Sequence, residues 1–280
     1  MIKALVLATA ASFFASVSAH GGVTSMSVGS TTYTGWSPYN PAAGQVSAER
    51  PYSSYDPILD PVAATMSCND DGNSGPNQQD ITIAAGDTIV AYWAQWTHAQ
   101  GPVTVYMAAC GGTTCTGVNS DTLSWFKISE MGLISGTLYN GSWANGILMA
   151  NLKWPATIPS NLKPGPYLIR FETLALHQAN TPQFYPECIQ LIVTGSGTAF
   201  PTSEYLKPIP GAWTATDPGV LIDIYSTAAQ TQTTYQIPGP PIYPGFSGIS
   251  TGTTTTGTTT TTKSSTTTST TTTSKSTTTT

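Results

Sequence analysis

The sequence predicts an all-β fold, an antiparallel β-sandwich of the immunoglobulin or fibronectin-III-like kind with long loops and little helix. Short runs of β-branched and aromatic residues recur along the chain, and several alternate between apolar and polar positions. Gly and Pro interrupt the chain at intervals of about ten to fifteen residues, as turns between strands require. No window carries a long apolar stripe of helical period between capping residues. The clearest strand candidates are residues 80–83, 88–93, 103–107, 167–171 and 188–193.

Residues 1–19 are typical of a secretory signal peptide. Lys3 precedes an apolar run, and small residues lead to Ala19. The run is shorter than the roughly 20 apolar residues that a membrane span needs. We therefore expect a secreted, extracellular protein whose mature chain begins at His20. Cleavage one or two residues away, after Ser18 or Gly21, is the alternative.

The mature chain is predicted to hold one folded domain, residues 20–246, and a tail. A Pro-rich segment at 236–246 marks the boundary, and residues 247–280 consist almost entirely of Thr and Ser. Such a tract cannot form a core and is typical of an O-glycosylated stalk or linker. Whether it ends the protein or leads to a further binding module is open. Residues 33–66, rich in Pro and Tyr, are predicted to form a long functional loop.

Charge and cysteine content narrow the function classes. Only 8% of residues are charged, and the net charge is −5. This composition excludes a nucleic-acid footprint and a patch for anionic membranes. Four cysteines in a secreted chain predict two disulfides with three possible pairings. The short spacing of Cys110 and Cys115 favours a local bridge, which leaves Cys68 with Cys188, and closing that long loop contributes roughly 4 to 5 kcal/mol.

The chain has three histidines, and two of them suggest a copper site. Cleavage after Ala19 gives His20 a free α-amine beside its imidazole, so this one residue is able to chelate a metal. His98 follows an apolar strand and precedes a Gly-Pro turn, where a side chain points off the end of a sandwich. Three nitrogens in a T suit tetragonal copper(II), which also leads the divalent metals in affinity for nitrogen ligands. Zinc prefers a tetrahedral set, often with Cys or carboxylate, and the sequence shows no such cluster.

Several longer motifs, taken in chain order, resemble the fungal lytic polysaccharide monooxygenases of auxiliary activity family 9, formerly glycoside hydrolase family 61. The resemblance spans nearly the whole mature domain and is carried by a set of segments. They are His20-Gly-Gly-Val, Thr97-His98-Ala-Gln-Gly-Pro-Val-Thr-Val-Tyr, Tyr167-Leu-Ile-Arg-Phe-Glu-Thr-Leu-Ala-Leu-His177, Gln183-Phe-Tyr185-Pro-Glu-Cys188-Ile-Gln-Leu and Ile209-Pro-Gly-Ala-Trp-Thr-Ala-Thr-Asp-Pro-Gly219.

The resemblance implies a role for each matching residue. His20 and His98 would form a histidine brace for one copper ion, with Tyr185 as the axial phenol. His177 and Gln183 would form hydrogen bonds to an oxygen species at the copper. Members of the family present a flat face on which aromatic rings stack against sugars. Trp213 is the first candidate for such a ring, and Tyr39 or Trp36 of the long loop is the second.

The predicted activity is oxidative cleavage of a β-1,4-glucan, most simply cellulose, at C1 or C4. An external electron donor, either a small reductant or a redox protein, and hydrogen peroxide or dioxygen would support it, and the protein would act as a monomer. The alternative is a copper- or carbohydrate-binding protein that keeps the brace without cleavage. Oxidation of xyloglucan, glucomannan or xylan is a further option, which loop shape decides. Asn140-Gly-Ser is a candidate N-glycosylation site. Glu172, Glu187 and Asp217 give no sign of the facing pair that a glycosidase requires.

Overall fold

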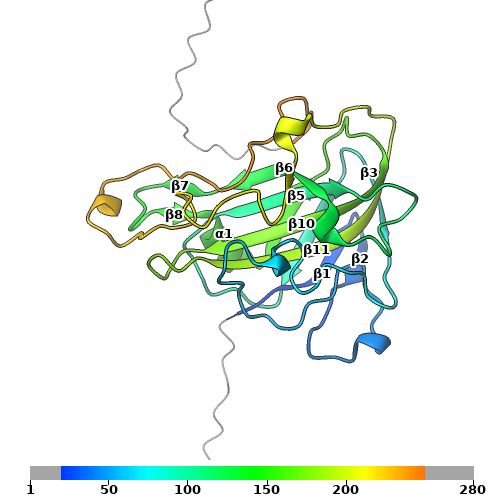
Figure 1. Ribbon diagram of the computed structural model, residues 1–280, viewed down its shortest axis with the longest axis horizontal. Helices are drawn as coiled ribbons and strands as arrows, with labels where there is room; N and C mark the ends of the chain where they lie inside the picture. Colours follow the sequence, from blue (N-terminus) through cyan, green and yellow to red (C-terminus); the bar gives the residue numbers. More distant parts are fainter. Residues whose placement is uncertain (1–19, 250–280) are drawn as a thin grey trace, which may run out of the picture.

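The computed structural model describes residues 20–249 and shows two β-sheets packed face to face (Figure 1). The predicted signal peptide and all but the first three residues of the predicted tail lie outside the described residues. The predicted β-sandwich is confirmed. The strands are β1 (Val23–Val28), β2 (Thr31–Thr34), β3 (Ile81–Ala84), β4 (Thr88–Trp93), β5 (Val103–Ala109), β6 (Ser124–Met131), β7 (Leu133–Ser135), β8 (Ser142–Trp143), β9 (Lys153–Thr157), β10 (Gly165–Ala175), β11 (Gln183–Thr194) and β12 (Lys207–Pro208).

One sheet has the strand order β2-β1-β4-β9 and the other β12-β6-β5-β10-β11-β3, while β7 and β8 form a separate ribbon. All pairs are antiparallel except β11 with β3, where Leu191 opposes Ile81 in parallel register. The prediction of a purely antiparallel sandwich therefore misses one edge. A short hairpin would force neighbouring strands to run antiparallel. Strand β3 instead reaches that edge from a long loop, so it is able to pair in parallel with β11.

Helix is as scarce in residues 20–249 as the sequence predicts. The α-helix α1 (Ala144–Asn151) is joined by five single 3-10 turns. The helix ends at Leu152, which takes a left-handed conformation with φ 52° and donates its N–H to the carbonyl of Leu148. None of the helices in these residues has the length and apolar character to cross a bilayer. The 3-10 turns are η1 (Ala42–Gly44), η2 (Ala64–Met66), η3 (Ser120–Thr122), η4 (Ser203–Tyr205) and η5 (Ala228–Gln230).

Strand β10 is buried on both faces, and its two sets of side chains enter two different cores. Tyr167, Ile169 and Phe171 point between the sheets. Leu168 and Leu174 point outward into a second core, which the segment after β11 covers. By contrast, β4 alternates strictly between buried and half-buried positions because its outer face meets solvent. The six-stranded sheet is therefore the rigid centre of the molecule.

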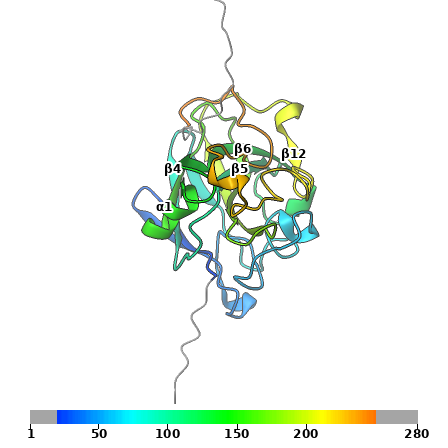
Figure 2. The same cartoon turned by 90° about the vertical axis from the view of Figure 1, so that its left-hand side faces the viewer.

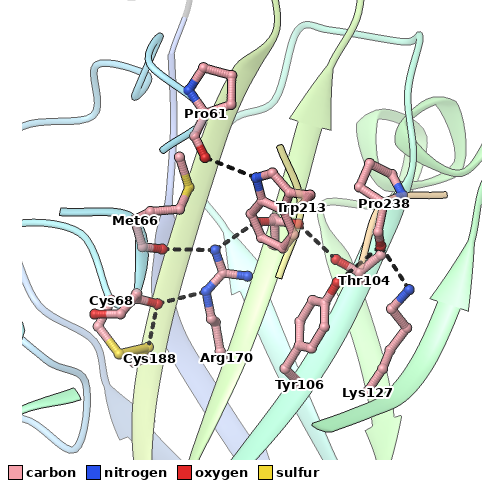
Figure 3. A network of polar contacts seen from close by, with 12 residues as sticks. Pro61, Met66, Cys68, Thr104, Tyr106, Lys127, Arg170, Cys188, Trp213 and Pro238 are labelled. Carbon is pink, nitrogen blue, oxygen red and sulfur yellow. Dashed lines mark hydrogen bonds and ion pairs between the residues drawn. A yellow bond between two sulfur atoms is a disulfide. The ribbon is translucent and has the colours of Figure 1, made fainter. Parts of the chain in front are cut away.

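Two disulfides join Cys68 to Cys188 and Cys110 to Cys115, as the sequence favoured. The first attaches the long early loop to β11 across 120 residues. Beside it, Arg170 of β10 donates to the carbonyls of Ser67 at 2.6 Å and Met66 at 2.9 Å (Figure 3). These contacts fix the early loop to the outer face of the six-stranded sheet.

The two ends of the described chain lie on opposite sides of the molecule in both views (Figures 1 and 2). The blue end at His20 lies at the lower edge, and the orange end at Ile249 lies at the upper edge. Ser247 is held there by Ser160, whose backbone N–H donates to the Ser247 carbonyl at 2.9 Å.

Candidate metal centre

His20 immediately precedes β1, and its segment is pressed closely against both sheets. A Cβ added to Gly21 would meet the Gln95 carbonyl oxygen at 2.1 Å, and one added to Gly22 would meet Glu187 Oε1 at 1.9 Å. Only glycine fits at such close approaches. The two glycines thus let the predicted mature end lie flat against the sandwich, which brings the His20 imidazole to the site.

His98 lies in the loop between β4 and β5, where the sequence predicted a side chain at the end of a strand. Gly101, with φ +127°, lets this loop approach the end of β10, since a Cβ there would meet the Leu174 carbonyl oxygen at 1.8 Å. Asn145 at the start of α1 donates to that same carbonyl at 3.0 Å. The ring centroids of His20 and His98 are 5.7 Å apart. Two imidazoles 78 positions apart in sequence thus become neighbours.

Burial keeps the His98 ring neutral. Desolvation, and then the nearby His177 and His20, lower the pKa of His98 to about 4. Desolvation followed by His20 also lowers the pKa of His177. Metal binding needs the neutral form of imidazole, so His98 has no proton to lose at neutral pH.

Strand β11 supplies the phenol. Gln183 and Tyr185 share one face of that strand because side chains alternate with period two. The Tyr185 hydroxyl donates to Gln183 Oε1 at 2.9 Å and lies 3.3 Å from His98 Nε2. Because its one proton goes to Gln183, the oxygen presents lone pairs toward His98. Burial and then Asp56 raise the pKa of Tyr185, so the phenol stays protonated at neutral pH.

His177 stacks directly on His98. The two rings are nearly parallel, at 5°, with centroids 4.1 Å apart. His177 Nδ1 is buried without a hydrogen-bond partner. Other buried side-chain atoms of residues 20–249 share this lack, so what distinguishes His177 Nδ1 is its place on a ring stacked against His98.

Two neighbours were missed by the sequence analysis. Trp96 packs edge-on against both His98 and Tyr185, with centroid distances of 5.2 Å and 4.9 Å. Asp56 of the long early loop brings Oδ1 within 3.5 Å of His20 Nδ1. Trp96 stands only two residues before His98, so that proximity was available as a signal. Asp56 had none, because only the fold brings its loop to the chain start.

The donor set fits copper. Two imidazoles and a phenol converge at one end of the sandwich, and His177 adds an imidazole nitrogen without a partner. Nitrogen donors of this kind suit copper(II). Among residues 20–249 no group of three or more His, Cys, Asp or Glu side chains is gathered as a catalytic zinc site requires.

Trp213 does not lie on the surface, which corrects the expectation for this residue. Its side chain is buried at 3% exposure, and its ring stacks on Phe184 with centroids 5.6 Å apart. Its indole N–H donates to the Pro61 carbonyl at 2.9 Å (Figure 3). The outward side chains of the six-stranded sheet need an apolar cover, and Trp213 provides part of it. Trp36 is also buried, and its indole N–H donates to the Tyr52 carbonyl at 2.9 Å.

Exposed tyrosines occur on two separate loops connected to the site, through Tyr55 next to Gly22 and through the His177 carbonyl. Tyr39 is 70% exposed and packs edge-on against Tyr55, with centroids 5.6 Å apart. On the other loop, Tyr225 is 44% exposed, and its hydroxyl donates to the His177 carbonyl at 3.0 Å. Tyr139 packs edge-on against Tyr225 at 6.2 Å. Sequence reasoning selected Tyr39 but missed the other pair.

Asn140 follows Tyr139 in the turn between β7 and β8. Its side chain is exposed, and Oδ1 accepts a hydrogen bond from the Thr137 hydroxyl at 2.8 Å. Glycan attachment uses Nδ2, so this hydrogen bond is compatible with modification. The turn therefore presents the acceptor side chain to solvent.

The three acids considered for hydrolysis lie in separate environments. Glu172 is paired with Arg170 at 2.6 Å. Glu187 accepts the Val23 N–H at 2.5 Å, and Asp217 is bonded to Thr214 on the surface. These three carboxylates do not face one another across a cleft as a glycosidase pair does.

Comparison with known proteins identifies relatives along nearly the whole domain. The sequence model of Auxiliary Activity family 9 (formerly GH61) matches residues 20–235. The AA9 family lytic polysaccharide monooxygenase-like protein CEL1 of Agaricus bisporus is 49% identical over 245 residues, which cover 87% of this chain and 76% of that protein. AA9 family lytic polysaccharide monooxygenase B of Heterobasidion irregulare is 51% identical over 231 residues, covering 82% and 93%.

Solved structures agree. The crystal structure of HiLPMO9B superposes with a TM-score of 0.77 at 50% identity, covering 81% of this chain and all of that one. A cellulose-active polysaccharide monooxygenase from M. thermophila superposes with a TM-score of 0.73 at 39% identity, covering 80% and 99%. The similarity in sequence and in structure covers the same folded domain.

Proposed function

The chain belongs to Auxiliary Activity family 9, the copper-dependent lytic polysaccharide monooxygenases, and on that premise we propose how its residues perform oxidative cleavage of a β-1,4-glucan. One copper ion would be held by the imidazole and freed α-amine of His20 and by His98, with the Tyr185 hydroxyl as a further oxygen donor. The observation that carries this assignment is the convergence of these three side chains, with centroid distances of 5.7 to 6.1 Å between each pair.

When bound, copper supplies one-electron redox chemistry and activation of an oxygen co-substrate, either hydrogen peroxide or dioxygen, with electrons from an external donor. The chain supplies geometry and protonation state. His98 offers a neutral ring because its pKa is lowered to about 4. Tyr185 offers a neutral oxygen because its proton is held by Gln183. The His98 and Tyr185 donors therefore add no charge of their own, and the Asp56 carboxylate stands beside His20.

His177 is the residue that we assign to the oxygen co-substrate. Stacking on His98 fixes its ring plane, and Tyr225 holds its backbone through the carbonyl. Its buried Nδ1 has no protein partner, so a proton can be held or released there. Gln183 contributes mainly by orienting the phenol, which differs from the direct oxygen contact that the family resemblance implied.

The substrate-docking surface that we propose consists of Tyr39 on one side of the site and Tyr225 with Tyr139 on the other. Exposed rings of this kind stack on the apolar faces of sugars, as they do on other flat ligands. The spread of rings over two loops connected to the site favours an extended polymer, and cellulose is the simplest candidate. Trp213 takes no part, because it is buried.

Secretion follows from the proposed signal peptide and from the disulfides, which persist in oxidising compartments. We also propose that the protein acts as a monomer and carries a glycan at Asn140.

The test is to incubate copper-loaded mature protein, beginning at His20, with cellulose and a reductant, and to identify soluble products by mass spectrometry. Aldonic-acid or 4-keto oligosaccharides are expected, and their identity assigns C1 or C4 oxidation. A form with one extra residue before His20 is the matched control, and it should lose activity with the chelate. Copper binding without oxidised products on any β-glucan would instead favour the binding protein.

A further inference from the structure

A carboxylate from one sheet holds the beginning of the other sheet beside the proposed copper site. Glu187 lies on β11 in the six-stranded sheet, and Val23 begins β1 in the four-stranded sheet. Glu187 Oε2 accepts the Val23 backbone N–H at 2.5 Å, and the side chain is buried. Leaving a buried backbone N–H without an acceptor costs its desolvation, so this hydrogen bond ties Val23 to Glu187.

The same side chain also limits where the segment lies. Glu187 Oε1 occupies the space in which a Cβ of residue 22 would stand, at 1.9 Å, so Gly22 is packed directly against it. One carboxylate thus bonds Val23 and bounds Gly22, the two residues that connect His20 to the sandwich after Gly21. The Tyr52 hydroxyl secures the segment from the early loop by donating to the Val23 carbonyl at 3.3 Å.

Strand geometry connects this contact to the site. Gln183, Tyr185 and Glu187 alternate with the buried residues between them and therefore share one face of β11. Tyr185 meets His98 on that face, while Glu187 meets the segment that carries His20. A single stiff strand thereby determines where both histidines lie relative to the phenol.

We infer that Glu187 is a positioning residue that sets the place of His20 relative to Tyr185 and His98. The inference rests on the proposed function, since it concerns the same histidines. A purely structural role for Glu187 would affect only stability. A positioning role also predicts that substituting Glu187 changes the geometry of the copper site. Loss of the contact leaves Val23 N–H unpaired and frees the three residues before β1 to shift.

The experiment compares four variants by copper(II) titration, by electron paramagnetic resonance of the copper-loaded mature protein, and by amide hydrogen exchange at Val23 in the copper-free protein. Glu187→Leu removes the acceptor. Gly22→Ala adds a Cβ that would clash with Glu187 Oε1 and so displaces the same contact. Both should weaken copper binding by about 10- to 100-fold, as loss of groups that orient metal ligands does. Both should also shift the resonance spectrum and speed exchange at Val23.

Glu187→Gln keeps an acceptor oxygen and should retain wild-type affinity and spectrum. Glu172→Gln is the matched control, because it alters a buried carboxylate of the neighbouring strand that bonds Arg170. It should lower the thermal midpoint with a wild-type copper spectrum. If Glu187→Leu does not fold, Gly22→Ala and the exchange measurement decide the matter.

Unchanged copper spectra and unchanged Val23 exchange in folded Glu187→Leu or Gly22→Ala would overturn the inference. Failure of the proposed function has a different signature, namely wild-type mature protein that binds no copper. In that case the Val23 exchange rates still test whether Glu187 holds the segment, because they are measured without the metal.

Discussion

The proposed copper site and the Arg170 cluster both adjoin the six-stranded sheet, yet they differ in how their buried polar groups carry charge. The Arg170 cluster consists of Arg170, Glu172, Thr104, Tyr106 and Lys127 on the outer face of the six-stranded sheet (Figure 3). In it Arg170 pairs with Glu172 and Lys127 pairs with Glu130, and both cations also reach backbone carbonyls of the covering loops, although Arg170 Nη1 is buried without a hydrogen-bond partner. At the copper site, His177 Nδ1 is left without a partner and two imidazoles stack face to face.

The difference separates a structural cluster from a site for a ligand. In the Arg170 cluster, Glu172 is bonded to Arg170 and to the Thr104 hydroxyl, at 2.6 and 3.0 Å. The Arg170 guanidinium also lies over the Tyr106 and Trp213 rings, at 5.5 and 5.8 Å. The Arg170 cluster holds paired charges whose loss would destabilise the fold, whereas a metal site needs neutral imidazoles that can still donate a lone pair. Substitutions in the two regions should therefore affect different measurements.

The largest expected effect is on stability, from Arg170→Met. It leaves Glu172 buried without its cation, and breaking a buried pair in this way costs about 3 to 5 kcal/mol in the free energy of unfolding. Chemical denaturation of the copper-free mature protein measures it. Copper affinity of the folded fraction should stay at the wild-type value, because Arg170 touches none of the proposed ligands.

The control for this prediction is the double variant Arg170→Met with Glu172→Leu. Removing both charges should recover much of the lost stability, since apolar replacement of a whole buried pair is often neutral. If the double variant were as unstable as the single one, the unpaired carboxylate would not be the cause. If Arg170→Met weakened copper binding, the two regions would not be separable.

The opposite pattern is expected for His98→Ala. Copper affinity should fall by on the order of 100-fold or more, because even loss of groups that only orient ligands costs about 10- to 100-fold. Unfolding of the copper-free protein should change less than for Arg170→Met, because the variant loses packing against His177 and Trp96 but leaves no buried charge unpaired. Wild-type protein should gain thermal stability on adding copper, by mass action, and the variant should lose that gain. A variant that kept the full copper-induced shift would contradict the assignment of His98.

Glu49 is a buried carboxylate without a neighbouring cation, and its substitution should affect stability less than Arg170→Met does. Glu49 is buried, and its Oε2 accepts the Trp36 N–H at 2.6 Å. Burial and then Glu187 raise its pKa well above the ordinary value. The folded protein thus binds a proton that the unfolded chain releases above about pH 4.5, so stability falls as pH rises above that value.

Glu49→Gln removes this titration. The slope of unfolding free energy against pH should become less negative by up to about 1.4 kcal/mol per pH unit, the value for one proton. Denaturation of copper-free protein at several pH values above 4.5 measures it. An unchanged slope would mean that Glu49 is ionised in the fold despite its lack of a cation.

The sequence predicted the features that depend on neighbouring residues, namely strand positions and motif residues. It did not predict features that depend on contacts between distant segments. Short runs of β-branched and aromatic residues between turn signals located β4, β5, β10 and β11, because that composition is itself the strand signal. The motifs around His98 and Tyr185 identified those residues through family resemblance. Trp213 was misplaced because nothing in its own segment tells whether the outer face of a distant sheet needs covering.

Long-range contacts carry no periodic signal. Tyr225 meets His177 across 48 positions, and Glu187 meets Val23 across 164. The parallel pairing of β3 with β11 is also a long-range contact. A strand pattern in the sequence predicts that a strand forms, but it does not predict its partner or its direction. The fold class was therefore predictable, while the surroundings of the site required the structure.

The smallest expected effect lies at the border between the two kinds of region, at Tyr225. Its hydroxyl is a structural donor to the His177 carbonyl, while its ring is half exposed beside the site. Tyr225→Phe removes only the hydrogen bond, which is worth about 0.5 to 1.5 kcal/mol, and leaves the ring for stacking. Unfolding should become easier by that amount, while binding to β-glucan should stay near the wild-type value. Tyr225→Ala removes the ring as well and should weaken β-glucan binding, measured by depletion from cellulose suspensions. If both variants bound cellulose equally well, the exposed ring would be part of the fold's cover, like Trp213, and the docking surface would have to lie on the Tyr39 side alone.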